Sequence, residues 1–350
     1  MPTRSDCRIG TAHMHPACGV KPEVKPAYAT LRNCTQDKPA FNSNQICARF
    51  CLYPDHSGKR AAEGGLRTRG IFKSPRPDKP LVTIVTTVLN RAHSIESAIC
   101  SVLGQDYENI EYIIIDARST DGTLQKIYKY SDVIDYFISE PDTSLYEGIN
   151  KGISLASGDY ILILNSDDTY DSNAVSTLVF EKYKRNAELV SGLARLVDHT
   201  GTVLREVPSL GCDARIMMRM LLRHELMLIS RELYNTVGLY DISYKIIADL
   251  KLTQSIFKKI NSFYEVDRPL MRFMNCGIAS MESKELIDER VRLIGENFPV
   301  LSNEDRIFLS KVKPRNYQKV ASMLSQYKDS PELATMLQSL LRFYNYWNYF

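Results

Sequence analysis

The sequence lacks the long hydrophobic runs that membrane spans require. Of its 350 residues, 44% are hydrophobic and 24% are charged, yet no stretch approaches the ~18 consecutive apolar residues of a spanning helix. The N-terminus also lacks the apolar core of a secretory signal peptide, because charge and proline interrupt it throughout. These two absences predict a cytoplasmic protein. The overall composition lies near the globular average, which excludes a collagen, a coiled-coil rod and wholesale disorder.

Residues 1–79 differ in composition from the rest of the chain. They carry 14 Lys or Arg against 6 Asp or Glu, five of the eight cysteines and eight of the fifteen prolines. A segment of this kind without sustained apolar periodicity cannot bury enough surface to offset its ordering entropy. We therefore expect a mostly disordered basic extension. The alternative is that the sequence has a non-native start upstream of the true domain.

A zinc site and a disulfide scaffold are the weaker alternatives for this extension. No second close pair accompanies the Cys47-x-x-x-Cys51 spacing, although several residues are possible zinc ligands: His13, His15, Cys18, Cys34, Cys47, Cys51 and His56. A disulfide scaffold is typical of chains with a secretory signal. The basic residues are scattered singly and form no block, so nucleic acid is not an expected partner.

From residue 81 the sequence alternates short β-rich runs with helical stretches. We predict strands at residues 81–88, 110–116, 134–139 and 160–165, and helices at residues 94–103, 123–130 and 144–156, with Ser94 as an N-cap. This order indicates an α/β fold with an open, mainly parallel sheet covered by helices on both faces. No GxGxxG follows the first strand and no GxxxxGK[ST] occurs, which disfavours dinucleotide and P-loop nucleotide sites.

Acidic and amide residues follow each predicted strand, at the sheet edge where such folds bind ligands. In strand order they are Asn90, Asp116, Glu140 with Asp142, and Asp167 with Asp168. A row of acids is costly there unless a cation or hydrogen-bond donors neutralise it. Oxygen ligands of this kind suit Mn²⁺ or Mg²⁺, held by one or two carboxylates plus substrate phosphates. The alternative for the Asp pair is a turn that caps a helix over residues 172–183.

Five stretches, in order and spacing, resemble the family 2 inverting glycosyltransferases, and most of all the bacterial exopolysaccharide and colanic-acid type. They are residues 83–90 (TIVTTVLN), 115–123 (IDARSTDGT), 139–152 (SEPDTSLYEGINKG), 156–168 (ASGDYILILNSDD) and 246–252 (IIADLKL). The resemblance covers residues 81–280. It implies a GT-A (Rossmann-like) fold, a nucleotide-sugar donor and a divalent metal.

The resemblance also implies roles for individual residues. Nucleotide-sugar contacts fall to Thr87, Asn90, Asp116, Ser119, Asn150, Lys151, Asp167 and His224. Asp116 lies where relatives bind the base, typically the uracil of a UDP-sugar. Asp167 and Asp168 match the metal and ribose site, with Asp168 the more direct metal ligand. Asp249 matches the catalytic base.

These residue types suit the implied chemistry. A metal at Asp168 would stabilise the negative charge that develops on the leaving diphosphate. Asp249 would take the proton of an acceptor hydroxyl, and attack from the opposite face would invert the anomeric centre. The chain departs from the family where Ala117-Arg118 replaces a Gly-Gly pair and Lys251 replaces a common second acid. Tyr146 is either a core residue or stacks on the acceptor sugar.

We expect three parts: an extension over residues 1–79, the GT-A domain over residues 80–283, and a helical region over residues 284–350. In the last part, the amphipathic pattern predicts helices at residues 284–297, 303–311, 316–327 and 331–349. Its final aromatic and basic residues fit either packing on the catalytic domain or peripheral contact with the inner face of the plasma membrane. Such contact would suit a lipid-linked acceptor, and a free saccharide is the other acceptor class.

Two other functions remain as alternatives. A sugar nucleotidyltransferase would need a glycine-rich loop with a basic residue after the first strand, where residues 89–92 read LNRA. A catalytically silent subunit that binds nucleotide sugar would have no need of Asp167, Asp168 and Asp249.

Overall fold

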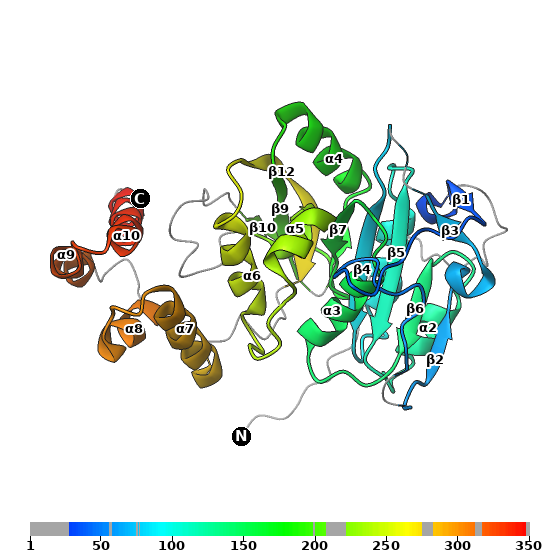
Figure 1. Ribbon diagram of the computed structural model, residues 1–350, viewed down its shortest axis with the longest axis horizontal. Helices are drawn as coiled ribbons and strands as arrows, with labels where there is room; N and C mark the ends of the chain where they lie inside the picture. The colour runs from blue at the N-terminus through cyan, green and yellow to red at the C-terminus, as the bar shows by residue number, and fades with distance from the viewer. Residues whose placement is uncertain are drawn as a thin grey trace, which may run out of the picture.

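A six-stranded sheet forms the centre of the computed structural model, which describes residues 28–55, 58–74, 76, 78–198, 200–207, 222–274, 283–311 and 317–347 (Figure 1). Its strands, in spatial order, are β11 (Ile229–Ser230), β7 (Tyr160–Ile163), β4 (Val82–Val88), β5 (Ile110–Asp116), β6 (Tyr136–Ser139) and β2 (Ala62–Gly64). The four inner strands are parallel, and β11 and β2 are antiparallel edge strands. The predicted mainly parallel α/β sheet is confirmed.

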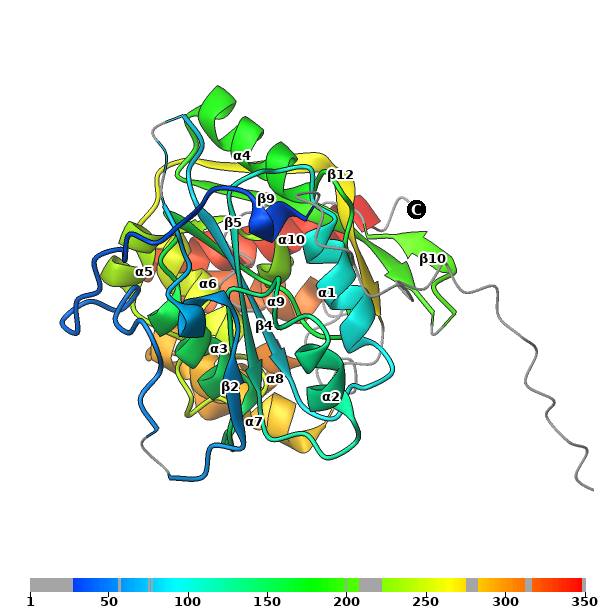
Figure 2. The same cartoon turned by 90° about the vertical axis from the view of Figure 1, so that its right-hand side faces the viewer.

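Helices cover both faces of this sheet. Figure 2 shows α1 (Ile95–Leu103) and α2 (Thr123–Tyr128) on one side of the strands and α3 (Leu145–Leu155) on the other. All seven residues of β5 are buried, and they alternate between the two layers. Tyr112 and Ile114 join the core that contains α1, whereas Ile113 and Ile115 pack with Leu155 of α3. The mostly β-branched sequence of this strand is typical of a strand that is buried on both faces.

A second sheet extends the fold beside the first. Its order is β10 (Val203–Glu206), β9 (Leu189–Val197), β12 (Phe263–Met274) and β8 (Thr169–Tyr170). Three further helices accompany it, α4 (Ala174–Arg185), α5 (Arg231–Val237) and α6 (Ala248–Phe257). Because β8 follows Asp168 directly and pairs with the end of β12, this sheet holds the loop after β7 in place.

Close packing of α3 on β4 positions the residues on that helix. A Cβ atom at Gly152 would lie 2.2 Å from Cγ1 of Val85, so any larger residue would push the helix away from the strand. At its start, the Ser144 side chain accepts a hydrogen bond from the backbone N–H of Glu147 (3.2 Å), which is a standard helix N-cap. Both features determine where Tyr146, Asn150 and Lys151 lie.

The expected disorder of residues 1–79 is wrong for the part from residue 28 onward that the structure describes. Besides β2, this segment contains β1 (Cys34–Thr35) paired with β3 (Phe72–Lys73), and two short 3₁₀ helices, η1 (Ala29–Leu31) and η2 (Leu66–Arg69). Strand β2 extends the central sheet by pairing with β6. Residues 1–27 lie outside the described residues.

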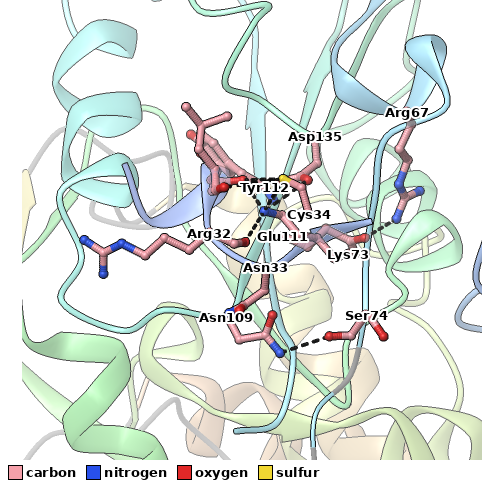
Figure 3. Close-up of polar contacts among 12 residues, drawn as sticks. Arg32, Asn33, Cys34, Arg67, Lys73, Ser74, Asn109, Glu111, Tyr112 and Asp135 are labelled. Atoms are coloured by element: carbon pink, nitrogen blue, oxygen red, sulfur yellow. Dashed lines mark hydrogen bonds and ion pairs between the residues drawn. The ribbon is translucent and has the colours of Figure 1, made fainter. Parts of the chain in front are cut away.

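Buried ion pairs explain why composition misled the prediction for this segment (Figure 3). Arg67 is almost fully buried, forms an ion pair with Glu111 of β5, and donates to the carbonyl oxygen of Leu155 (2.9 Å). Lys73 is equally buried, donates to the carbonyl oxygen of Arg32 (2.8 Å), and lies 4.0 Å from the carboxylate of Asp135. Arg67 therefore neutralises an acid of the sheet and Lys73 lies near a second one, roles that apolar periodicity does not reveal.

Neither a disulfide nor a zinc cluster is found among the described residues. Cys34, Cys47, Cys51 and Cys100 are thiols, and burial raises the pKa of Cys47 to about 12. The described ranges contain no group of three His, Cys, Asp or Glu side chains arranged to hold a metal. His13, His15, Cys18 and His56 lie outside them.

The predicted C-terminal helices are present as α7 (Lys284–Asn297), α8 (Asn303–Ser310), α9 (Tyr317–Gln326) and α10 (Pro331–Trp347). They share an apolar core that includes Phe298, Leu309 and Leu337. The start of this bundle docks on α6, where the Asn297 side chain donates to Gln254 (2.7 Å) and Lys258 donates to Asn297 (2.9 Å). No described helix is both long and apolar enough to cross a bilayer. The side chains of residues 343–350, which carry the expected aromatic contact, lie outside the description.

The buried pair predicts a large effect on stability. Replacing Arg67 by alanine would leave the carboxylate of Glu111 buried without its cation, so we expect the free energy of unfolding to fall by about 3–5 kcal/mol. The matched control is Arg69→Ala, which removes an exposed pair with Asp132 (2.6 Å) and is expected to cost less than about 1 kcal/mol. Urea unfolding followed by circular dichroism measures both. Equal losses in the two variants would contradict this account of the N-terminal segment.

Candidate functional site

The loops that follow β4 and β5 are joined at the carboxyl edge of the central sheet. The backbone N–H of Asn90 donates to Oγ of Ser119 (2.8 Å), and Oδ1 of Asn90 accepts from the N–H of Thr120 (2.8 Å). Asn90 and Arg118 both have positive φ angles, 52° and 64°, which lets the two loops turn tightly. The structure thus brings together two of the expected nucleotide-binding residues, Asn90 and Ser119.

Asp116 lies at the base of these loops and is fully buried. Its carboxylate accepts hydrogen bonds from the N–H of Ser119 (3.1 Å) and from Oγ of Ser139 (2.6 Å). These donors compensate the buried charge. Asp116 therefore organises the loop, and its expected contact with a base stays a prediction.

The expected donor-side residues of α3 are engaged with neighbouring loops. The amide of Asn150 donates to the carbonyl oxygen of Tyr240 (2.8 Å) and accepts from the N–H of Tyr240 (3.0 Å). Lys151 is buried and forms ion pairs with Glu140 (2.8 Å) and Asp142 (2.5 Å). Burial nevertheless raises the pKa of Asp142 to about 6. Both α3 residues therefore position loops around the site.

Thr87 lies near the end of β4 and is also buried. Its Oγ1 has no hydrogen-bond partner in the described part of the chain. Gly148 of α3 faces it, because a Cβ atom there would lie 3.1 Å from Cγ2 of Thr87. An unused buried hydroxyl at a strand end is consistent with the expected contact to a ligand.

The Asp pair after β7 divides into two different environments. Asp167 accepts from Nε of Arg91 (2.9 Å) and from Oγ of Ser94 (2.8 Å). Ser94 begins α1 as predicted, but its side chain binds Asp167 instead of capping the helix. Asp168 is more deeply buried, accepts from the N–H of Met274 (3.0 Å), and lies 3.4 Å from Nδ2 of Asn165. No cation of the described residues pairs with Asp168.

These surroundings make Asp168 the better candidate to hold a divalent cation. Burial, and next the charge of Glu225, raise the pKa of Asp168 well above its usual range. A bound cation would reverse this penalty by favouring the ionised carboxylate. Since no cluster of three protein ligands occurs among the described residues, the remaining ligands would be substrate phosphates and water, as is usual for Mg²⁺.

Asp249, the expected base, lies in the first turn of α6 with about one fifth of its side chain exposed. The hydroxyl of Tyr146 lies 3.1 Å from Oδ1 of Asp249 and 2.8 Å from the carbonyl oxygen of Ile246. Oδ2 of Asp249 lies 3.5 Å from Nδ1 of His224. Burial raises the pKa of Asp249, the charge of His224 lowers it, and that of Glu225 raises it further. Tyr146 is thus a buried residue in direct contact with Asp249.

A continuous set of polar contacts joins the two acids. It runs from Asp168 through Asn165 to Glu225 (Nδ2 to Oε1, 2.9 Å), and from Glu225 to His224 (Oε2 to Nδ1, 3.4 Å), which contacts Asp249. The short 3₁₀ helix η4 (His224–Leu226) carries both middle residues. Residues remote in sequence therefore converge on one site.

Sequence reasoning misses four residues of this site: Arg91, Ser94 as a partner of Asp167, Asn165 and Glu225. Signals for three of them are nonetheless present. Glu225 adjoins His224, and Arg91 and Ser94 follow Asn90 in the loop after the first strand. Asn165 stands between an apolar strand and the Asp pair, and its amide donates to Asp168 and to Glu225.

Comparison with known proteins shows that much of this site lies in a region that matches a known family. The model of the family "Glycosyl transferase family 2" matches residues 83–229. A GalNAc(5)-diNAcBac-PP-undecaprenol beta-1,3-glucosyltransferase of Campylobacter jejuni is 29% identical over 138 residues, covering 38% of this chain and 44% of the relative. The UDP-Glc:alpha-D-GlcNAc-diphosphoundecaprenol beta-1,3-glucosyltransferase WfgD of Escherichia coli is 30% identical over 127 residues, covering 36% of this chain and 50% of the relative.

A solved structure shares the fold. TarS 1-349 of S. aureus in complex with UDP-GlcNAc matches with a TM-score of 0.52 and 13% identity, covering 77% of this chain and 92% of that chain. At this identity the likeness concerns the fold alone. The chain spans no more than half the length of the curated relatives named above.

Proposed function

Because this chain is a family 2 glycosyltransferase with a GT-A fold, we propose that it moves a sugar from a nucleotide-sugar donor to a hydroxyl of a saccharide or lipid-linked acceptor. The reaction inverts the anomeric carbon and depends on a divalent metal. The convergence of Asp168 and Asp249 through Asn165, Glu225 and His224 carries the proposal. It supplies one acid for the donor diphosphate and another for the acceptor.

Donor binding uses the carboxyl edge of the central sheet. Thr87, Asn90, Asp116 and Ser119 would contact the nucleotide, while Asp168 would hold the metal together with the donor diphosphate and Asp167 would adjoin the ribose. The bound ion, Mn²⁺ or Mg²⁺, supplies Lewis-acid stabilisation of the leaving diphosphate. Arg91 and Ser94 keep Asp167 oriented. A UDP-sugar is the preferred donor, in line with the relative named for UDP-Glc.

Asp249 acts as the general base on the acceptor. Its carboxylate takes the proton from the acceptor hydroxyl while the oxygen attacks the anomeric carbon from the face opposite the diphosphate. The new glycosidic bond forms as the bond to the diphosphate breaks. Tyr146 and His224 hold Asp249 from two sides, so its free lone pair is oriented before the acceptor arrives.

A lipid-linked saccharide is the acceptor class that the relatives favour. Both curated relatives carry undecaprenol in their names. An acceptor of this kind would bring the protein to the inner face of the plasma membrane during synthesis of a surface polysaccharide. Contact through the last helix stays a prediction.

The role of Asp249 predicts a loss of transfer without a loss of donor binding. In Asp249→Asn the side chain keeps its size but cannot accept a proton, so kcat should fall by roughly 10²–10⁴-fold. UDP affinity in the presence of Mn²⁺, measured by calorimetry, should stay within about twofold of the parent protein, since the base lies on the acceptor side. The exposed Asp267→Asn is the matched control. Transfer by Asp249→Asn at the normal rate would disprove the base assignment.

Because Asp167 and Asp168 lie in different environments, we expect their substitutions to have different effects. Asp168→Asn should abolish the increase in UDP affinity that Mn²⁺ causes, because a neutral amide is a poor ligand for the ion. Asp167→Asn should keep most of that increase, since Arg91 and Ser94 already occupy its oxygens. Calorimetry measures the UDP affinity of each variant once with Mn²⁺ and once with EDTA. An equal loss in both variants would contradict the different roles.

The raised pKa of Asp249 predicts the acid side of the pH–rate profile. The base works only when ionised, so kcat/KM should fall as the pH drops through a pKa that lies above the ~3.9 of an ordinary aspartate. In Tyr146→Phe this limb should move to higher pH, because the hydrogen bond from Tyr146 lowers the pKa of Asp249. The exposed Tyr128→Phe should leave the limb unchanged. A limb centred at or below pH ~4, or one that Tyr146→Phe does not move, would argue against this base.

A further inference from the structure

We propose that Glu225 is a positioning residue that couples the metal-binding acid Asp168 to the base Asp249. One of its carboxylate oxygens accepts a hydrogen bond from Asn165, and the other lies against the imidazole of His224. The inference rests on the proposed function and deepens it. It gives Glu225 no contact with substrate, because the residue would act through Asn165 and His224. None of the five motifs of the sequence includes this residue.

The place of Glu225 is determined from two sides. It is 3% exposed, its Oε1 accepts from Nδ2 of Asn165 (2.9 Å), and its Oε2 lies 3.4 Å from Nδ1 of His224 without forming a hydrogen bond to any described residue. Its backbone carbonyl oxygen accepts from the hydroxyl of Tyr170 (2.5 Å). Since Tyr170 ends β8, two residues after Asp168, the backbone and the side chain of Glu225 are both tied to the loop that carries Asp168.

Stability alone does not account for a carboxylate at this position. Glu225 is buried close to two further acids, Asp168 and Asp249, and His224 is the one described residue that pairs with it as a potential cation. A carboxylate that is buried among other acids carries a desolvation cost that an apolar residue would not carry. Its two directed contacts, one toward each reacting side, are the features that an apolar residue would lose.

The same contacts orient the imidazole of His224. Nδ1 faces two carboxylate groups, those of Glu225 (3.4 Å) and Asp249 (3.5 Å), and this surrounding negative charge favours a hydrogen on Nδ1 over one on Nε2. Nε2 is buried and has no hydrogen-bond partner within the described ranges. A carboxylate that holds one nitrogen of a histidine fixes the ring and leaves the second nitrogen for a ligand. Glu225 therefore sets which atom of His224 is available to the donor or the acceptor.

Two substitutions separate the two contacts. Glu225→Gln keeps an oxygen that accepts from Asn165 but places an amide beside Nδ1 of His224. Glu225→Ala removes both contacts. We expect Glu225→Gln to keep the affinity for UDP with Mn²⁺ within about twofold while kcat falls roughly tenfold, and Glu225→Ala to weaken that affinity by roughly 10–100-fold as well. Glu232→Gln, an exposed glutamate in the first turn of α5, is the control.

Calorimetry with Mn²⁺ and UDP measures the first quantity without any need for turnover, and transfer kinetics measure the second. Unchanged values in both variants would overturn the proposal, and so would an equal loss of Mn²⁺-dependent UDP affinity in both, which would make Glu225 a direct metal ligand. If Glu225→Ala fails to fold, Asn165→Ala tests the same arm and should weaken the affinity to a similar extent.

The outcome is distinguishable from a failure of the proposed function. A parent protein that binds no UDP with Mn²⁺ would refute the donor assignment itself. If Asp249→Asn were fully active, the base assignment would fail, yet the affinity difference between Glu225→Gln and Glu225→Ala would still test the coupling to Asp168. A double-mutant cycle of Glu225→Gln with Asp249→Asn should be non-additive in kcat, because the two residues act through His224.

Discussion

Neutralisation of buried carboxylates is the constraint on which this structure depends. At the carboxyl edge of the central sheet most of the acids are matched by the protein itself: serine donors surround Asp116, Lys151 pairs with Glu140, and Arg91 pairs with Asp167. Among the described residues, no Lys or Arg side chain forms an ion pair with Asp168 or Asp249. The unbalanced charge is therefore concentrated where a metal, a diphosphate and an acceptor proton would enter.

At the opposite ends of the same strands, the buried acids lie near basic side chains of the protein. Glu111, near the start of β5, and Asp135, just before β6, are buried and receive Arg67 and Lys73 from the N-terminal segment (Figure 3). This segment lies outside the region that matches the family model. It is nevertheless integral to the sheet, because removing its basic residues would leave two sheet acids buried without cations.

Much of the fold follows from the sequence because parallel strands that are buried on both faces have near-continuous apolar sequences. The run before Asp116 predicts β5 at its observed bounds, and α7 likewise begins and ends where its periodicity indicates. The N-terminal segment and the second sheet are different. Their strands are short or partly exposed, and the burial of Arg67 depends on a partner 44 residues away. A pattern local to the segment cannot show such a contact.

For the site, motifs identify side chains but not the atoms that those side chains use. Asn150 and Lys151 are predicted as donor contacts, yet their hydrogen bonds and ion pairs hold the loops at Tyr240 and Glu140. Conversely, Asp249 lies beyond the family match at residues 83–229, and two residues within that match contact it, Tyr146 of α3 and His224 of η4. The helix η4 also carries Glu225, which contacts Asn165 beside the Asp pair. A single turn of helix thus connects the acids after β7 with the first turn of α6, the two places where we propose that donor and acceptor bind.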